Sequence, residues 1–219
     1  MEIYTIKRNQ IKMMRDRGYK LGETDKLILD MSREQFSNYI KDEGIEGLNE
    51  SYLTKGLPKV YIYFSEDDIN KKLAQSILET SNPSKYDNLI LIVKDINNIK
   101  SEALNELSQN FSKIKINIFT YEKLLVRPTK HSFSPKYRKL SDAEKEAIIK
   151  EIPIRQMSIL RSSDIREYKL ENTQQRAKIF SDPIVEYLGL NPDDVVEITG
   201  SNFYLNILVK EYISYAYVK

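Results

Sequence analysis

The sequence predicts an α/β N-terminal domain followed by a small α+β C-terminal domain. Three short apolar stretches, KVYIYF, LILIV and KIKINIF, alternate with helical patterns in the first half of the chain. Strands that alternate with helices favour a layered, at least partly parallel sheet. The pattern changes after Leu125, where prolines, hydroxyl-bearing residues and charges indicate a linker. We therefore expect domains at residues 1–126 and 141–219, joined by a linker at 127–140.

The first part of the N-terminal domain is predicted to be helical. Apolar residues recur at roughly helical spacing over residues 3–17. A second helix is expected after Ser32, which forms a capping-box pattern with Gln35, and it should end at Gly44. The segment that follows, as far as Pro58, is expected to be a loop.

The predicted sheet begins with KVYIYF, in which apolar residues alternate as they do in a strand. The next stretch, SEDDINKKLAQSILET, has the apolar spacing of a helix, and we expect Asp67 and Asp68 in its first turn, where the helix dipole favours acids. LILIV is apolar at every position, which predicts a strand buried on both faces. A further helix from about Ser101 and the strand KIKINIF complete the sheet.

The C-terminal domain is predicted from two capped helices and a group of strands. Ser141 and Glu144 form a capping box at the start of DAEKEAIIKE. In the stretch SDPIVEYLGLNPDDVVEI, Asp182 can cap a short apolar helix, Pro183 suits its first position and Gly189 can end it. A turn and a β-branched strand should follow. Two Tyr-containing strands, FYLNILV and EYISYAYVK, complete the domain.

Composition and charge exclude several classes of protein. The 219 residues are enough to bury a core, and 34 Lys and Arg against 32 Asp and Glu give a net charge of +2. A protein whose main ligand is nucleic acid usually has a more positive net charge, so we expect any DNA contact of this chain to be local. The absence of Cys removes disulfides and thiolate metal sites. No apolar run is long enough to cross a membrane and no signal-peptide core is present, so we expect a soluble intracellular protein.

Motifs of common enzymes are absent from the sequence. The only histidine, His131, lies in the predicted linker, and we interpret it as a solvated loop residue. There is no phosphate-binding loop, dinucleotide fingerprint, nucleophile elbow or HExxH zinc motif. The sequence therefore indicates no catalytic residue, cofactor or metal ligand.

A nuclease of the restriction-enzyme type is the main enzymatic alternative. Such a site needs an acid and then a strand that carries acid-x-Lys, so that carboxylates hold Mg²⁺ and the lysine polarises the attack. The sequence offers Asp67, Asp68 and Lys94, but Ile92 stands where the second carboxylate is required. An EYK motif at 167–169 lies in the other domain and has no evident acidic partner.

Three stretches of the sequence resemble the fifth common subunit of eukaryotic nuclear RNA polymerases, which has a small archaeal counterpart. The stretch SPKYRKLSDAEKEAIIKE is similar to the segment that joins the two domains of this family, and MMRDRGYKL is similar to a helix end of its eukaryotic form. The third stretch, SDPIVEYLGLNPDDVVEI, is similar to the signature of its C-terminal domain, with matches at Asp182, Pro183, Gly189, Val195, Val196 and Ile198.

The sequence also departs from the pattern of that family. The Leu-Pro of its first signature is missing, and Arg176 to Ile179 stand there instead. The Arg of its final Tyr-x-x-Tyr-Arg is replaced by Ala216. This divergence, with an AT-rich composition, suggests a large nucleocytoplasmic DNA virus or a fast-evolving protist as the source, and we favour the virus.

The resemblance implies an accessory subunit that does no chemistry of its own. The N-terminal domain would be a "jaw" with an inactive restriction-endonuclease-like fold, near the downstream duplex DNA. The C-terminal domain would be the polymerase-assembly domain shared with the archaeal counterpart, docked on the largest polymerase subunit. For this contact we single out residues of the signature and of the last strand: Asp182, Pro183, Tyr187, Gly189, Val195, Val196, Tyr212 and Tyr215.

One loop of the predicted jaw is a candidate for a DNA contact. Asn98, Lys100 and Ser101 stand where the family has a DNA-side element, directly before a helix whose first N–H groups and Lys100 could touch a phosphate. A polymerase subunit of this kind would lie in the virion and host cytoplasm if viral, and in the nucleus if cellular. The alternatives are the nuclease and a stand-alone transcription adaptor.

Overall fold

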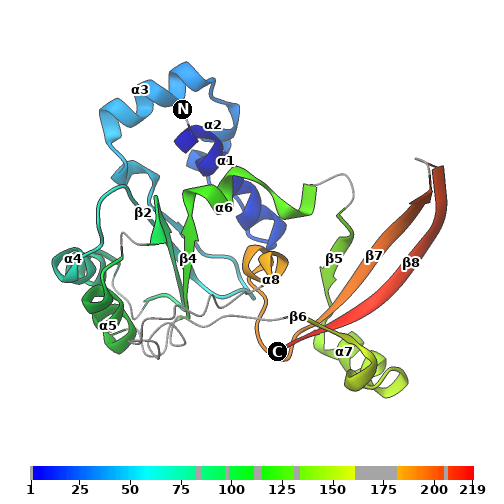
Figure 1. Cartoon of the computed structure of the whole chain (residues 1–219). Helices are drawn as coiled ribbons and strands as arrows, with labels where there is room; N and C mark the ends of the chain where they lie inside the picture. Colours follow the sequence, from blue (N-terminus) through cyan, green and yellow to red (C-terminus); the bar gives the residue numbers. More distant parts are fainter. Residues whose placement is uncertain are drawn as a thin grey trace. The chain divides into compact units, whose positions relative to one another are not determined.

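The computed structural model describes residues 2–81, 85–96, 99–110, 115–130, 134–160, 182–204 and 207–219. The contacts among these residues divide them into two compact units, with the division between Val126 and Arg127. Each unit contains one four-stranded sheet (Figure 1). The mixed α/β character expected from the sequence is confirmed.

The sheet of the N-terminal unit has the strand order β1-β2-β3-β4. Strands β2, β3 and β4 run parallel, as the alternation of strands and helices predicted, and β1 pairs antiparallel with β2. Five of the six residues of β3 are buried, which confirms a strand covered on both faces. The strands are β1 (Glu50–Tyr52), β2 (Val60–Ser65), β3 (Asn88–Val93) and β4 (Lys115–Thr120).

Helices cover both faces of this sheet. On one face, α4 (Lys71–Ser81) and α5 (Ser101–Asn110) pack their apolar side chains against Leu89, Leu91 and Val93 of β3. The other face carries α1 (Glu2–Asp16): the Lys7 ammonium lies 5.4 Å from the centre of the Phe64 ring in β2. Beside α1 lies α6 (Tyr121–Leu125), held by a hydrogen bond of 2.8 Å from Asn9 Nδ2 to the carbonyl oxygen of Leu124.

Several short elements of the N-terminal unit were missed by the sequence reasoning. The capping box of Ser32 and Gln35 starts α3 (Arg33–Glu43) as predicted, but α2 (Glu23–Asp30) precedes it without having been expected. The segment expected to be a loop contains the 3₁₀ helix η1 (Glu46–Leu48) and strand β1. These elements matter because the side chains of α2 and β1 form a buried polar cluster with α1.

The start of α4 differs from the prediction. We expected Asp67 and Asp68 in its first turn, but the helix begins at Lys71 and its first turn contains no acid. The physical reason is Asn70, whose side-chain oxygen accepts a hydrogen bond of 3.0 Å from the N–H of Leu73 and so caps the helix. Asp67 and Asp68 lie in the loop between β2 and α4.

The C-terminal unit has a sheet of strand order β5-β7-β8-β6. Strands β7 and β8 form a long antiparallel pair, β5 pairs antiparallel with β7, and β6 runs parallel to β8. Since β5 lies within 127–140, part of the segment expected as a linker belongs to this sheet. The strands are β5 (Lys136–Lys139), β6 (Ser158–Leu160), β7 (Val195–Tyr204) and β8 (Ile207–Val218); the 3₁₀ helices are η4 (Pro128–Lys130) and η5 (Ile154–Gln156).

Two helices cover opposite faces of the C-terminal sheet. The capping box of Ser141 and Glu144 starts α7 (Asp142–Glu151) as predicted, and α7 packs on the face that carries Val195. Helix α8 (Pro183–Leu188) packs on the face that carries Val196. Adjacent residues of a strand point to opposite faces, so this pair divides the core of the unit into two layers. None of the helices in the described part of the chain is both long and apolar enough to cross a membrane.

Candidate partner-binding site

The turn-and-helix unit that follows Ser181 is built as its sequence predicts. The carboxylate of Asp182 accepts a hydrogen bond of 2.9 Å from the N–H of Ile184, and Pro183 occupies the first helical position. Gly189 ends the helix in the left-handed conformation, with φ of 66°. The turn closes through a hydrogen bond of 2.8 Å from the N–H of Asn191 to the side chain of Asp194. The local geometry of this stretch therefore follows from its residues.

The same turn is attached to the last strand by main-chain hydrogen bonds. The N–H of Asp193 donates to the carbonyl oxygen of Val218 at 2.8 Å, and the N–H of Val218 donates to the carbonyl oxygen of Asp194 at 2.9 Å. These bonds fix the direction in which β7 leaves the turn beside β8. The capped helix and its turn thus act as a scaffold for the sheet.

Three of the residues proposed for partner contact lie inside the unit. Val195 and Val196 are 1% and 0% exposed, because α7 and α8 cover the two faces of their strand. Tyr187 is 2% exposed, and its hydroxyl accepts a hydrogen bond of 3.2 Å from Nε of Arg127. These side chains stabilise the unit itself and do not present a surface to another chain.

The remaining proposed residues lie at or near the surface. Pro183 is exposed, and Asp182, Gly189, Tyr212 and Tyr215 are half-buried. These five positions come from α8 and its two caps and from β8. They are the members of the predicted set that another protein could touch.

Tyr212 lies across the backbone of a glycine on the neighbouring strand. Gly200 is paired with Tyr212 in the register of β7 and β8, and a Cβ atom at Gly200 would meet the tyrosine ring at 2.4 Å. Real Cβ atoms do not come so close, so only glycine leaves room for this ring position. Gly200 therefore determines how Tyr212 is presented.

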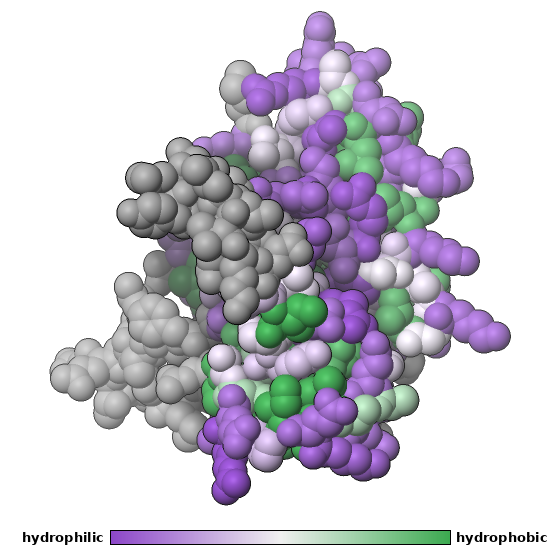
Figure 2. All heavy atoms as spheres, turned by 90° about the vertical axis from the view of Figure 1, so that its right-hand side faces the viewer, coloured by the Kyte–Doolittle hydropathy of each residue, from purple (hydrophilic) through white to green (hydrophobic). Residues whose placement is uncertain are grey.

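Two exposed isoleucines on the opposite sheet face were missed by the sequence reasoning. Ile213 is 62% exposed and Ile159 is 49% exposed. Ile159 pairs with Tyr217, and Ile213, Tyr215 and Tyr217 share one face of β8 because residues two apart point the same way. The alternation in EYISYAYVK was the signal that could have placed Ile213 on this face. In Figure 2, patches of hydrophobic atoms lie between hydrophilic side chains on the surface that faces the viewer.

An ion-pair network fixes α7 to the sheet. Arg138 of β5 binds Glu197 of β7 through two nitrogens, both at 3.1 Å, and binds Glu144 of α7 at 2.8 Å. Hydrogen bonds from the backbone of Ser141 and from Arg138 lower the pKa of Glu144 to about 2. The start of α7 is thus connected to two strands at once, beside the face that carries the exposed isoleucines.

The predicted DNA-side loop of the N-terminal unit is only partly described. Asn98 lies outside the described residues, and Ser101 is the first residue of α5, whose side chain is likewise outside the description. Lys100 donates its backbone N–H to the carbonyl oxygen of Ile69 at 3.0 Å. Its ammonium forms an ion pair of 3.0 Å with Asp68, and both side chains are about half exposed. Lys100 is therefore held against the loop that precedes α4.

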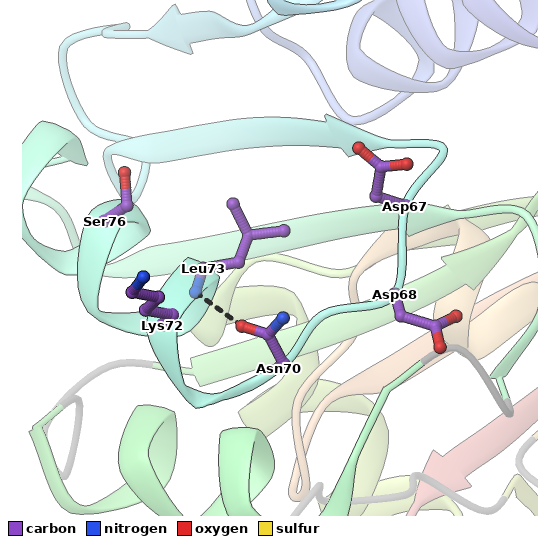
Figure 3. Close-up of a pocket in the computed structure, with 6 residues that line it drawn as sticks. All are labelled: Asp67, Asp68, Asn70, Lys72, Leu73 and Ser76. Atoms are coloured by element: carbon purple, nitrogen blue, oxygen red, sulfur yellow. Dashed lines mark hydrogen bonds between the residues drawn. The ribbon is translucent and has the colours of Figure 1, made fainter.

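The nuclease alternative finds little support in the geometry of its candidate residues. Asp67 and Asp68 line an open hollow of about 600 Å³ at the end of β2, and Figure 3 shows their carboxylates pointing in different directions. Ile92, at the position of the required acid, is fully buried, and Lys94 follows β3 on the surface. In the described ranges, no three His, Cys, Asp or Glu side chains are grouped so that they could hold a metal ion. His131 and the EYK motif at 167–169 lie outside the described residues.

Comparison with known proteins identifies the second unit. Residues 126–218 match the family described as RNA polymerase Rpb5, C-terminal domain. This segment is therefore similar to the C-terminal domain of the Rpb5 family. The resemblance seen in the sequence is confirmed, and the Rpb5 C-terminal match contains every described strand of the second sheet.

Similar proteins extend the similarity to both units. The chain is 26% identical over 215 residues to "DNA-directed RNA polymerases IV and V subunit 5B" of Arabidopsis thaliana, covering 97% of this chain and 87% of the relative. It is 27% identical over 201 residues to "DNA-directed RNA polymerase V subunit 5A" of the same plant, covering 89% and 80%. "DNA-directed RNA polymerase subunit 5-like protein 1", also from Arabidopsis thaliana, is 23% identical over 218 residues, covering 91% and 89%.

Proposed function

We propose that this chain is a non-catalytic, accessory subunit of a multisubunit DNA-directed RNA polymerase. The observation that carries the proposal is the length of the similarity: relatives named as polymerase subunit 5 align with 97% and 89% of the chain. The match therefore includes the N-terminal unit as well as the Rpb5 C-terminal domain. The absence of an acid at Ile92 agrees with an accessory role.

The C-terminal unit is proposed to dock on the largest polymerase subunit. Ile213 and the half-buried Tyr215 lie on the sheet face that carries α7, and they offer apolar area with a polar tip, which suits the buried centre of a protein interface. Tyr212 lies on the opposite face, which also carries α8 with Pro183 and Gly189 at its two ends, so the partner would contact both faces of the sheet. Tyr187, Val195 and Val196 contribute from inside by holding the helix and the strand in place.

The N-terminal unit is proposed to be the jaw that lies near downstream DNA. Its parallel strands with helices on both faces are compatible with a restriction-endonuclease-like fold that lacks the active site. Lys100, together with the start of α5, is the candidate for a phosphate contact. This contact would be local, because the net charge of the chain is only +2.

The place of action follows from the proposal. A subunit encoded by a cell would work in the nucleus, and one encoded by a large DNA virus would be found in the virion and the host cytoplasm.

Mass spectrometry of complexes purified through a tag on this chain tests the proposed function. We expect near-stoichiometric recovery of the two largest polymerase subunits, with chemical cross-links from the largest subunit to residues after Leu140. Lys145 and Lys150 of α7 provide amines close to the proposed surface, and Lys26 of α2 is a matched exposed amine that should not cross-link to the same partner region.

The other outcomes separate the alternatives. Recovery with unrelated proteins and without polymerase subunits would favour a stand-alone adaptor. Recovery of the chain alone, together with Mg²⁺-dependent DNA cleavage that is lost in Asp67→Asn, would favour the nuclease. Either result would overturn the polymerase assignment.

A further inference from the structure

A cluster of ionisable side chains is enclosed in the N-terminal unit where α1, α2 and β1 meet. Lys7 is 1% exposed, and its ammonium donates to the carbonyl oxygen of Leu48 at 3.0 Å and to Glu50 Oε2 at 3.2 Å. The hydroxyl of Tyr52 donates to Asp25 Oδ1 at 2.7 Å, and both of these side chains are almost fully buried. The Glu50 side chain is 17% exposed, so one amine and two carboxyl groups share a largely enclosed volume.

The hydroxyl proton of Tyr52 can serve only one of the two carboxyl groups that approach it, Asp25 or Glu50. Its oxygen also lies 3.4 Å from Glu50 Oε2, but its single proton is directed at the nearer Asp25. The same oxygen accepts a hydrogen bond of 3.1 Å from Gln10 Nε2 and can accept a second. A proton on the Glu50 carboxyl would complete this contact, because protonated Glu50 could donate to the tyrosine oxygen.

Burial favours the protonated form of Glu50. Burial raises the pKa of Glu50 to about 7, with a further rise from Asp25, and the ammonium of Lys7 opposes this only in part. Burial lowers the pKa of Lys7 itself. The remaining ionisable groups that face Glu50 are the hydroxyls of Tyr52 on β1 and Tyr39 on α3. With both carboxyls ionised, the enclosed group would hold two negative charges against one positive charge.

We propose that the Glu50 carboxyl is protonated in the folded N-terminal unit and donates this proton to the oxygen of Tyr52, inside the cluster that α1, α2 and β1 enclose. Asp25 and Glu50 both approach the oxygen of Tyr52, so losing the proton places two carboxylates around one hydroxyl. The N-terminal unit therefore contains a proton-sensitive cluster where three elements meet. It is independent of the proposed polymerase role and concerns the unit's own stability and opening.

The direction of the pH effect follows from linkage. The unfolded chain releases the Glu50 proton near its ordinary value of 4.5, whereas the folded protein keeps it to about pH 7. The stabilisation is therefore complete below about pH 4.5 and is lost as pH rises through about 7. For one such proton, the unfolding equilibrium constant of the N-terminal unit should increase about tenfold between about pH 6 and about pH 8.

The test is a titration of the full chain labelled with ¹³C at the glutamate side-chain carboxyl. We expect one carboxyl signal to titrate near pH 7 and to be absent in Glu50→Gln. In the same variant, the pH dependence of the unfolding midpoint between pH 6 and pH 8 should flatten. Amide hydrogen exchange in α2 and β1, corrected for the intrinsic pH dependence of exchange, should become faster at pH 8 than at pH 6 in the wild type, and this difference should disappear in the variant.

Glu46→Gln is the matched control, because Glu46 lies four residues earlier in η1 with an exposed side chain. It should keep the wild-type pH dependence. The proposal is overturned if the Glu50 signal titrates near its ordinary value, or if Glu50→Gln retains the tenfold change. If the Gln variant does not fold, the titration of the wild-type signals decides the matter.

Discussion

The two sheets of the molecule differ in how far helices cover their faces. The N-terminal sheet has helices on both faces, and its strand β3 is buried at five of six positions. In the C-terminal sheet, α7 and α8 pack near one end of the long strands, and β7 and β8 continue beyond them (Figure 1). Ile213 in the continuing part of β8 is 62% exposed. The comparison teaches that helices cover both faces of the first sheet, whereas the second sheet keeps exposed apolar surface beyond its helices.

The largest effect should come from opening the N-terminal core. Leu91 is fully buried in β3 between the helices. Leu91→Ala removes buried methyl groups and leaves a cavity, so we expect a loss of about 2–5 kcal/mol in the free energy of unfolding. Urea denaturation followed by circular dichroism measures this loss.

Ile213→Ala is the contrasting change in the C-terminal sheet. Because Ile213 is exposed, the free energy of unfolding should change by less than about 0.5 kcal/mol, while recovery with the polymerase should fall. A large loss of stability in the isolated chain, with unchanged recovery of the polymerase subunits, would show that Ile213 belongs to the core of the unit. That result would contradict the difference between the two sheets.

The next effect concerns the close approach of Tyr212 to Gly200. A methyl group at Gly200 would collide with the far end of the Tyr212 ring, which must turn away, so Gly200→Ala should destabilise the C-terminal unit by about 1 kcal/mol, the lower end of the cost of overpacking. If the ring is the obstacle, Tyr212→Ala should make room for the added methyl group. We therefore expect the double variant to lose less stability than the sum of the single variants, measured as a double-mutant cycle. Strict additivity would contradict the proposed coupling.

The smallest effect is expected at the exposed ion pair of the N-terminal unit. Lys100→Glu should weaken retention of downstream duplex DNA by the assembled polymerase a few-fold, and lower the salt slope by about one. Asp68→Asn releases Lys100 from its 3.0 Å ion pair and should strengthen retention. Retention of labelled duplex at several salt concentrations measures both. Shifts in the same direction, or no shift in either variant, would remove Lys100 from the DNA surface.

The sequence predicted the elements whose apolar pattern is regular. The parallel strands β2, β3 and β4 and the capped helix α8 were found because burial and capping leave a local pattern in the residues. The missed strands β1, β5 and β6 are short, and β1 (ESY) and β5 (KYRK) are also polar. They form because a neighbouring strand supplies hydrogen-bond partners, which no local pattern reveals. Helix α2 was not predicted because one of its buried residues is Asp25, and aspartate is usually exposed to solvent. Asp25 is buried because it accepts a hydrogen bond from Tyr52 of β1, which the local sequence does not reveal.

The proposed contact residues could be predicted only in part. Family resemblance indicated Tyr187, Val195 and Val196, but it cannot separate residues that hold a surface in place from residues that form it. That distinction depends on which faces α7 and α8 cover, and so on tertiary packing. Ile213 was missed for the same reason, since its exposure depends on where α7 ends.

The order of the strands in the C-terminal sheet has a consequence for synthesis on the ribosome. One layer of its core joins Leu140 and Met157 to Val195, and the other joins Val185 to Val218, so the core cannot close until β8 has emerged. The described strands of the N-terminal unit end at Thr120, so this unit can fold while the second sheet is still being translated. The nascent chain should therefore carry a folded N-terminal unit while the exposed face of the second sheet is still unformed, and any protein that binds that face can do so only after the last strand is in place.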